Sequence, residues 1–164
     1  MMNIIKSLLA LLLITLVAAL ATGCCGKKVP VLEEAGKAYV EGNYRKAVLM
    51  FLPEAEDGNA EAQVNIAFMY YCGMHVEKDP SVAAEWYKKA AERNNVTAQF
   101  SLGTLYENGE GVNRDIEEAY FWYNLAEKQG DKDSQKLRRE LEQTLSAAQI
   151  SRAKSRIATW KPIQ

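Results

Sequence analysis

The amino-acid sequence predicts an all-α, right-handed α-solenoid of helix-turn-helix repeats that ends in a C-terminal capping helix pair. Three observations support this fold class. The chain repeats itself at a spacing of 36 residues, each copy contains two segments with apolar residues at helical spacing, and glycine, aspartate or proline marks the segment ends. The chain of 164 residues is long enough for one domain of this kind.

Residues 1–23 have the composition of a signal peptide. Lys6 is their only charged side chain, and it precedes an apolar run of 14 residues from Leu8 to Ala21. A membrane-spanning helix needs about 20 apolar residues, so the run is short for a retained membrane helix, which is the alternative. A positive start, an apolar centre and small residues at the end are typical of an export signal.

The end of this segment resembles the bacterial lipobox and reads Leu20-Ala21-Thr22-Gly23-Cys24. In that family the signal is cut before a cysteine whose sulfur carries a diacylglycerol. Gly23 is the small residue required before the cut, whereas Ala21 stands where the family prefers leucine. The resemblance implies that Cys24 is lipidated and that the chain is a bacterial lipoprotein.

Residues 24–30 are predicted to be a lipidated N-terminus and a short tether. Seven residues reach at most about 25 Å, so the folded domain is expected to lie close to the periplasmic face of a membrane. Several acyl chains anchor a protein stably, because each buried methylene adds roughly 0.8 kcal/mol. The lipoprotein sorting rule of Gram-negative cells associates an aspartate directly after the lipidated cysteine with retention in the inner membrane. Cys25 stands at that position in this chain, so by this resemblance the outer membrane is the expected location.

Residues 31–59 are predicted to form a truncated first repeat. They resemble a tetratricopeptide repeat at Ala35, Tyr39, Gly42, Tyr44 and Ala47. The second helix of this repeat keeps the 36-residue register of the later copies. Pro53 lacks a backbone N–H and is expected to interrupt and kink that helix.

Residues 60–95 and 96–131 are two full copies of the repeat, with ten identical positions when they are aligned without a gap. The identical pairs are Ala62/Ala98, Gln63/Gln99, Tyr70/Tyr106, Gly73/Gly109, Val76/Val112, Asp79/Asp115, Ala83/Ala119, Trp86/Trp122, Tyr87/Tyr123 and Ala90/Ala126. Apolar residues of the first helix share one face, and a glycine ends it. Asp79-Pro80 and Asp115 then cap the second helix of each copy.

The combined pattern resembles the Sel1-like repeat, a relative of the tetratricopeptide repeat. The matching pattern is A-x-x-x-[IL]-[AG]-x-x-Y-x-x-G-x-x-V-x-x-D, followed by A-x-x-W-Y-x-x-A. The resemblance implies a solenoid that binds another macromolecule and catalyses nothing. Some cysteine-rich relatives are linked to β-lactam binding, but this chain lacks their paired cysteines, so that function is not carried over.

Residues 132–164 are predicted to form two capping helices that close the apolar end of the solenoid. Leu137, Leu141 and Leu145 make an apolar stripe on the first of them. Ser146 and Gln149 have the spacing of a capping box, which begins the last helix.

The sequence offers little for catalysis or metal binding. His75 is the only histidine, and it falls in a predicted surface loop without a cysteine cluster nearby. Cys72 is expected to be a half-buried small residue, and the three cysteines form no disulfide framework. Paired carboxylates such as Glu117-Glu118 lie near helix starts, where acids suit the helix dipole. We therefore predict no enzyme activity, no metal and no cofactor.

Charge is distributed unevenly along the chain. Residues 24–131 hold 11 basic and 18 acidic residues, whereas residues 132–164 hold 8 basic and 3 acidic ones. The basic side chains either solvate the capping helices or face an acidic partner or anionic headgroups. The residues concerned are Lys136, Arg138, Arg139, Arg152, Lys154 and Arg156. Nucleic acid is not expected, because basic and aromatic residues do not alternate.

The first helix of each repeat is expected to line the partner-binding side of the solenoid. Positions that differ between the copies are free to serve function, because shared positions solve the same packing problem. Phe68 and Tyr71 are aromatic where the next copy has Thr104 and Glu107, and exposed aromatics often anchor interfaces. The predicted partner-binding residues are Asn65, Phe68, Tyr71, Ser101, Thr104 and Asn108. Alternatively, the first repeat packs over Phe68 and Tyr71.

These features predict a non-enzymatic adaptor or scaffold of the bacterial cell envelope, which holds another envelope protein near the membrane. The family resemblance also implies a narrower alternative, an immunity protein that inhibits a toxin enzyme delivered into the periplasm. An envelope hydrolase is the weakest alternative, since it would need a pocket that joins His75 to a nucleophile.

Overall fold

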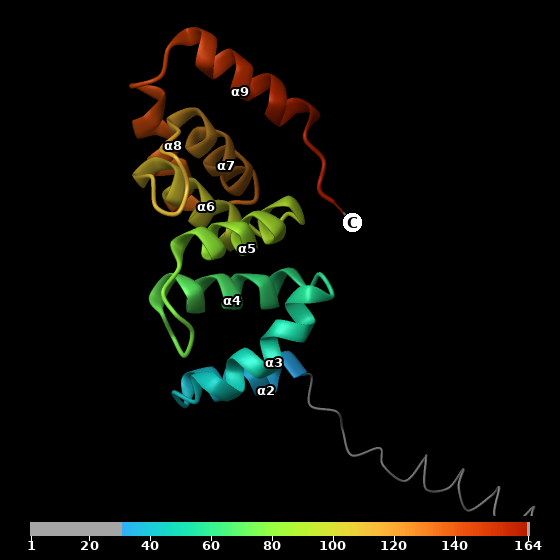
Figure 1. Ribbon diagram of the computed structural model, residues 1–164. Coiled ribbons are helices and arrows are strands. Elements are labelled where there is room, and N and C mark those ends of the chain that lie inside the picture. The colour runs from blue at the N-terminus through green and yellow to red at the C-terminus, as the bar shows by residue number, and fades with distance from the viewer. Residues whose placement is uncertain (1–30, 164) are drawn as a thin grey trace, which may run out of the picture. The chain divides into compact units, whose positions relative to one another are not determined.

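The computed structural model describes residues 31–163, and every regular element in that range is an α-helix (Figure 1). The helices are α2 (Val31–Val40), α3 (Tyr44–Glu56), α4 (Ala60–Cys72), α5 (Pro80–Glu92), α6 (Val96–Asn108), α7 (Ile116–Lys128), α8 (Lys132–Glu142) and α9 (Ala147–Thr159). The predicted all-α class is thus confirmed for this part of the chain. The predicted signal peptide, Cys24 and the tether lie outside the described residues.

The helices from Leu32 onward form one compact unit. From α3 to α8, each helix packs against the next one in the chain, while α9 packs on α7. Figure 1 shows these helices following one another along a single stack. Packing between neighbours in sequence is the property that defines a solenoid.

The 36-residue register sets the helix starts well beyond the two full copies. The starts of α3, α5 and α7 share this spacing, and so do the starts of α4, α6 and α8. The residue before each of these helices caps it, and the caps are Asn43, Asn59, Asp79, Asn95, Asp115 and Asp131. Each cap side chain accepts a backbone N–H from the first turn, which the helix itself leaves unpaired.

Left-handed residues end the first helix of each full copy. Gly73 and Gly109 have φ angles of 73° and 74°, and their N–H groups donate to carbonyl oxygens of the last helical turn. Two residues further on, His75 (φ 60°) and Gly111 (φ 70°) adopt the same conformation. His75 is exposed in this loop, as the sequence predicts. Gly111 has no room for a side chain, because a Cβ there would lie 2.1 Å from the Pro80 carbonyl oxygen.

Small and aromatic side chains build the core between the helices. The repeated alanines let the helices approach closely and are completely buried at Ala83, Ala90, Ala119 and Ala126. The rings of Tyr87 and Trp122 are each only 5% exposed. Gly103 permits a close approach of α6 to α7, because a Cβ there would lie 2.7 Å from a ring carbon of Tyr123.

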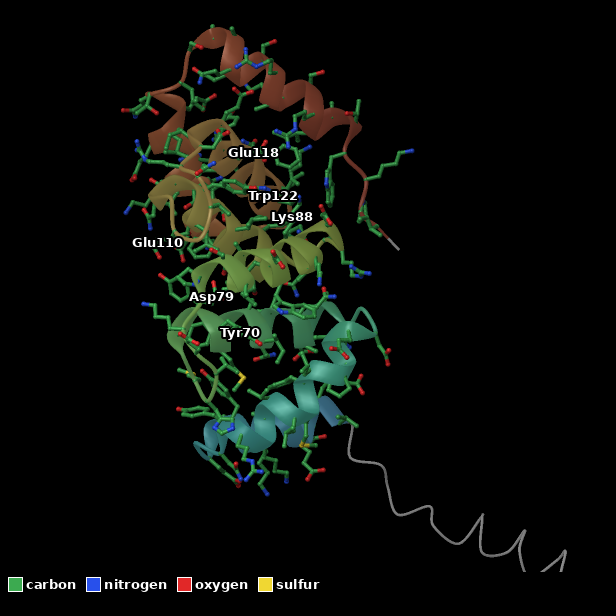
Figure 2. The ribbon with its side chains drawn as sticks, in the orientation of Figure 1. Tyr70, Asp79, Lys88, Glu110, Glu118 and Trp122 are labelled. Carbon is green, nitrogen blue, oxygen red and sulfur yellow. The ribbon has the colours of Figure 1, made fainter. Side chains whose placement is uncertain are left out.

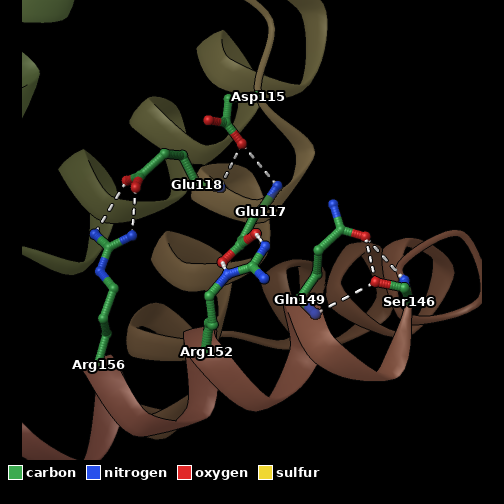
Figure 3. Close-up of polar contacts among 7 residues, drawn as sticks. All are labelled: Asp115, Glu117, Glu118, Ser146, Gln149, Arg152 and Arg156. Carbon is green, nitrogen blue, oxygen red and sulfur yellow. Dashed lines mark hydrogen bonds and ion pairs between the residues drawn. The ribbon is translucent and has the colours of Figure 1, made fainter.

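The C-terminal helices follow the predicted pattern closely. Leu141 on α8 is buried, and so are Ala153 and Ile157 on α9. The capping box at the start of α9 is present (Figure 3). In it the Ser146 N–H donates to Gln149 Oε1 at 3.0 Å, and the Gln149 N–H donates back to Ser146 Oγ at 3.4 Å.

Two local expectations are wrong. Pro53 lies inside α3, which continues to Glu56, so the expected interruption is absent, although α3 does bend along its length (Figure 1). The missing N–H leaves only one carbonyl without its helical partner, and Leu49, four residues earlier, is 65% exposed, so water can replace that bond. Cys72 is exposed rather than half-buried, because it is the last residue of α4 and the chain turns into a loop directly after it.

Candidate partner-binding site

Four of the six predicted partner-binding residues line one hollow between α4 and α6. Phe68 and Tyr71 come from α4, and Ser101 and Thr104 come from α6. The hollow has a volume of about 170 Å³, and the remaining lining residues are Tyr87, Phe100 and Leu105. We call it the α4/α6 hollow. Its lining is mostly apolar, so it suits an apolar side chain of a partner.

The other two predicted residues do not line the α4/α6 hollow. The side-chain amide of Asn65 donates to the Glu61 carbonyl oxygen of its own helix at 2.9 Å. The amide of Asn108 lies at the end of α6 and donates to Glu110 Oε1 at 3.3 Å. Both side chains thus form hydrogen bonds with nearby residues. A comparison of the two repeat copies selects these positions but does not show such local bonds.

Phe68 is only partly covered by the first repeat. The Tyr39 ring of α2 meets it edge-on, with the ring centroids 6.5 Å apart. Phe68 nevertheless stays 39% exposed. The first repeat therefore supports one side of this ring and leaves the other side available for contact.

Tyr71 is held in place by the second full repeat. Its hydroxyl donates to Glu110 Oε2 at 2.6 Å, and the Lys78 ammonium lies 5.8 Å from the ring centroid. The hydrogen bond to Glu110 and burial both raise the pKa of the Tyr71 hydroxyl, so it is a neutral donor at physiological pH. A ring fixed in this way loses little side-chain entropy when a partner binds.

Two tyrosines of the second helices adjoin the site, since Tyr87 lines the hollow and Tyr123 contacts Thr104. Burial raises the pKa of Tyr87 to about 12, with Ser101 acting in the opposite direction. The Tyr123 hydroxyl donates to Glu107 Oε2 at 2.8 Å and lies 3.1 Å from Thr104 Oγ1. Burial is also the largest cause of the raised pKa of Tyr123.

Sequence reasoning misses these two tyrosines, because it assigns positions shared by both copies to the scaffold. Tyr87 and Tyr123 do pack in the core, yet Tyr87 also lines the α4/α6 hollow and Tyr123 orients Thr104. The shared Tyr after each Trp is the signal that could identify them. A repeated residue can therefore serve both packing and binding.

The basic C-terminal residues are largely neutralised within the chain. Arg152 forms a two-point ion pair with Glu117, with Nη2 and Oε2 2.6 Å apart, and Arg156 pairs in the same way with Glu118 (Figure 3). Arg138 contacts Glu127 and Glu142, and Lys154 lies 3.6 Å from Glu142. Only Lys136 and Arg139 of the six have no ion pair within residues 31–163. This surface offers little net charge to an acidic partner.

The described residues contain no group of His, Cys, Asp and Glu side chains arranged to hold a metal ion. None of the helices between residues 31 and 163 is long and apolar enough to cross a membrane. His75 lies in an exposed loop and lines neither the α4/α6 hollow nor a larger cleft beside α9.

Helix pairs stacked in a fixed 36-residue register define an α-solenoid repeat protein. Residues 60–95 and 96–131 each match the Sel1 repeat family. The chain is a Sel1-like repeat protein, and repeats of this family generally act as protein-interaction scaffolds.

Several solved structures are similar to the chain, among them the following two. A Sel1 repeat protein from Oxalobacter formigenes shares 32% identity at a TM-score of 0.63, over 65% of this chain and 44% of that one. The protein c5321, a protective antigen present in uropathogenic Escherichia coli strains and displaying an SLR fold, shares 29% identity at a TM-score of 0.75. That match covers 82% of this chain and 30% of c5321. The chain thus spans less than half of either protein, and no curated protein matches it.

Proposed function

We propose that this chain is a non-enzymatic, lipid-tethered adaptor of the bacterial cell envelope, and that its protein partner binds at the α4/α6 hollow. The observation that carries the proposal is the setting of Phe68. Its ring is 39% exposed at an apolar hollow, next to the fixed ring of Tyr71. Aromatic groups beside an apolar pocket are frequent anchors of protein interfaces.

The hollow and its surroundings indicate what a partner would bring. A volume of about 170 Å³ suits one large apolar side chain, since an apolar cavity of roughly 150 Å³ holds a benzene ring. The carboxylates of Glu107 and Glu110 lie beside it, each bound by a tyrosine hydroxyl. A partner segment with an apolar anchor next to a lysine or arginine would therefore match both the shape and the charge of the site.

The location in the envelope is proposed from the sequence of residues 1–30. Their signal-like composition and the Gly23-Cys24 junction support export and lipidation. A domain joined to the lipid by a few residues would meet partners at or near the membrane surface, with the outer membrane favoured. Labelling with radioactive palmitate tests this part, because a Cys24→Ser variant should lose the label.

The binding proposal is tested by crosslinking in intact cells, purification of the tagged lipoprotein and mass spectrometry. The test variant carries Phe68→Ala and Tyr71→Ala. The control variant carries Leu49→Ala, because Leu49 is 65% exposed on α3 and does not line the hollow. We expect one protein at constant stoichiometry with the wild type and the control, and its loss with the double variant.

The identity of the recovered protein then distinguishes between an adaptor and an immunity protein. An envelope protein would support the adaptor, whereas a toxic enzyme would point to an immunity protein. If the double variant retains the same partner as the wild type, the α4/α6 hollow is not the binding site. Circular dichroism of the double variant verifies that any loss does not come from unfolding.

A further inference from the structure

A pocket with a volume of about 320 Å³ lies where the end of α3, the start of α4 and the end of α5 meet. We call it the Gln63 pocket. It shares no lining residue with the α4/α6 hollow, which lies toward the other end of α4. The residues that line the Gln63 pocket are Ala55, Glu56, Gly58, Gln63, Trp86, Lys89 and Arg93.

The side chain of Gln63 is buried with part of its amide unpaired. Gln63 is only 2% exposed, and its Nε2 donates to the Ala55 carbonyl oxygen at 2.9 Å. Its Oε1 has no hydrogen-bond partner among the described residues. Since buried polar atoms are nearly always paired, this oxygen is an acceptor that lacks its donor.

The next copy of the repeat shows which groups complete such an amide. Gln99 is the counterpart of Gln63 in the 36-residue register, and it is completely buried. Its Nε2 donates to the Ala91 carbonyl oxygen at 3.2 Å and to Asn94 Oδ1 at 3.3 Å. Its Oε1 accepts from Gln129 Nε2 at 2.8 Å. Two neighbouring carboxamides thus satisfy the Gln99 amide.

The first copy lacks both of these carboxamides. Gly58 stands at the position of Asn94, and Arg93 stands at the position of Gln129. Gly58 has no side chain to offer, and Arg93 Nη1 donates to the Lys89 carbonyl oxygen of its own helix at 3.3 Å. Both residues line the pocket, so the pocket lies where the two missing amide groups would be.

The register also shows that the unpaired oxygen faces this pocket. Nε2 of both glutamines bonds to the carbonyl oxygen eight residues earlier, so Gln63 Oε1 is directed toward position 93, as Gln99 Oε1 is toward Gln129. The oxygen of Gln63 is closed off from solvent in this structure. Gln129 is nevertheless exposed, so the path from the surface to the oxygen passes position 93.

Arg93 is free to leave that path. Its side chain makes one hydrogen bond, to the Lys89 carbonyl oxygen, and no ion pair within residues 31–163. A Cβ added at Gly58 would lie 3.2 Å from Arg93 Nη2, so the guanidinium covers the glycine. Rotation of this one flexible side chain opens the Gln63 amide to a ligand.

The charges around the pocket do not select a charged ligand. Lys89 and Arg93 are opposed by Glu56, and none of the three forms an ion pair in the described part of the chain. Lys89 Nζ already lies 3.9 Å from the centroid of the Trp86 ring, which is a favourable contact for a cation. The incomplete amide is therefore the selective group, and it favours a neutral ligand.

We propose that the Gln63 pocket binds a primary carboxamide. The ligand nitrogen donates to Gln63 Oε1, and the ligand oxygen accepts the second N–H of Gln63 Nε2. A primary amide presents both groups on one side, whereas a trans peptide group holds its N–H and C=O on opposite sides. An asparagine or glutamine side chain of another protein and a free carboxamide metabolite share this chemistry. The site stands or falls independently of the proposed adaptor function.

The test follows the side-chain amide ¹H–¹⁵N signals of the full-length chain in a mild detergent. Gln63→Met and Gln99→Met variants assign the two glutamine signals by their loss. The first probes are propionamide, N-methylpropionamide and propionate. Free glutamine and a pentapeptide with one central glutamine, acetyl and methylamide ends, then distinguish the two sources.

Two variants of Arg93 test the site in opposite directions. Arg93→Ala opens the path to the Gln63 amide, whereas Arg93→Gln supplies the carboxamide that the next copy has at this position. Lys88→Ala is the control. Lys88 also comes from α5, but it lies beside Trp122 of α7 and does not line the Gln63 pocket (Figure 2).

We expect a saturable shift of the Gln63 signal with propionamide, and none with N-methylpropionamide or propionate. The Gln99 signal should stay unmoved, because that amide already has its partners. Arg93→Ala should bind propionamide about three- to tenfold more tightly than the wild type, because no side chain has to be displaced. Arg93→Gln should bind it at least about tenfold more weakly, because its own amide occupies the site. Lys88→Ala should bind like the wild type.

Tighter binding of the pentapeptide than of free glutamine would assign the carboxamide to a protein side chain, and the reverse order to a free metabolite. The proposal is overturned by an unmoved Gln63 signal, or by equal binding of propionamide and either of the other two small probes. Equal affinities of Arg93→Ala and Arg93→Gln for propionamide would overturn it as well.

Discussion

Replacement of Gly111 by alanine is predicted to destabilise the fold and to loosen the α4/α6 hollow at the same time. Gly111 has a φ of 70°, and an added Cβ would lie 2.1 Å from the Pro80 carbonyl oxygen and 2.7 Å from the Ser81 nitrogen. Ordinary van der Waals contacts of a Cβ begin at 3.4 Å. Since both neighbours are backbone atoms at the start of α5, the loop has to move away from that helix.

The size of the effect follows from two terms. The left-handed conformation costs an L-residue about 1–2 kcal/mol, and insertion of a methyl group into packed structure costs about 1–3 kcal/mol. We therefore expect the free energy of unfolding to fall by about 2–5 kcal/mol, out of about 5–15 kcal/mol for a whole domain. The movement would also displace Glu110, the preceding residue, and break its 2.6 Å hydrogen bond with the Tyr71 hydroxyl.

Urea unfolding followed by circular dichroism measures the change in stability. The matched control is His75→Gly, because His75 occupies the same loop position in the first full copy, with a φ of 60°. Glycine relieves the left-handed strain there but adds about 0.4–1 kcal/mol of unfolded-state entropy, so the control should stay within about 1 kcal/mol of the wild type. A Gly111→Ala protein as stable as the wild type would refute the reasoning about this loop.

Three other perturbations follow from the contacts above. Glu110→Gln weakens the acceptor of the Tyr71 hydroxyl, so we expect binding of the crosslinked partner to weaken about three- to tenfold in an interferometry assay, with stability changed by less than about 1 kcal/mol. Burial raises the pKa of Tyr87 from 10.0 to about 12, so the folded state holds this proton more tightly than the unfolded state does. The contribution of this proton to the free energy of unfolding is complete below pH 10, and up to about 3 kcal/mol of it is lost as the pH rises to 12. Urea unfolding at a series of alkaline pH values should therefore show a smaller loss of stability for Tyr87→Phe than for the wild type. Arg156→Gln breaks the partly exposed ion pair with Glu118, so it should lower the free energy of unfolding by no more than about 1 kcal/mol. High salt should remove the difference in urea unfolding between this variant and the wild type, because salt screens the pair.

The fold could be predicted from the sequence because its signals are local. Each cap needs only an aspartate, asparagine or serine within a few residues of the backbone groups that it satisfies, as at Asp79, Asp115 and Ser146. The 36-residue register then repeats these signals at fixed positions. Pro53 shows where local reasoning fails, since the cost of a lost hydrogen bond depends on solvent exposure, which the chain does not reveal directly.

The candidate site could be predicted only in part. Phe68 and Tyr71 differ between the copies, and this difference indicates them without any structure. The contacts that fix the site join residues far apart in the chain, such as Tyr71 with Glu110 and Tyr123 with Glu107. The larger cleft beside α9 is further from prediction, because four helices, α5, α6, α7 and α9, and the segment after α9 form its walls.

The most direct test of the central claim is photocrosslinking in living cells from a photoreactive phenylalanine analogue at position 68. The same analogue at position 49, on the exposed face of α3, is the control. If the α4/α6 hollow binds a protein partner, position 68 should give one discrete crosslinked product and position 49 should not give it. The absence of a product from position 68, or the same products from both positions, would contradict the proposed binding site.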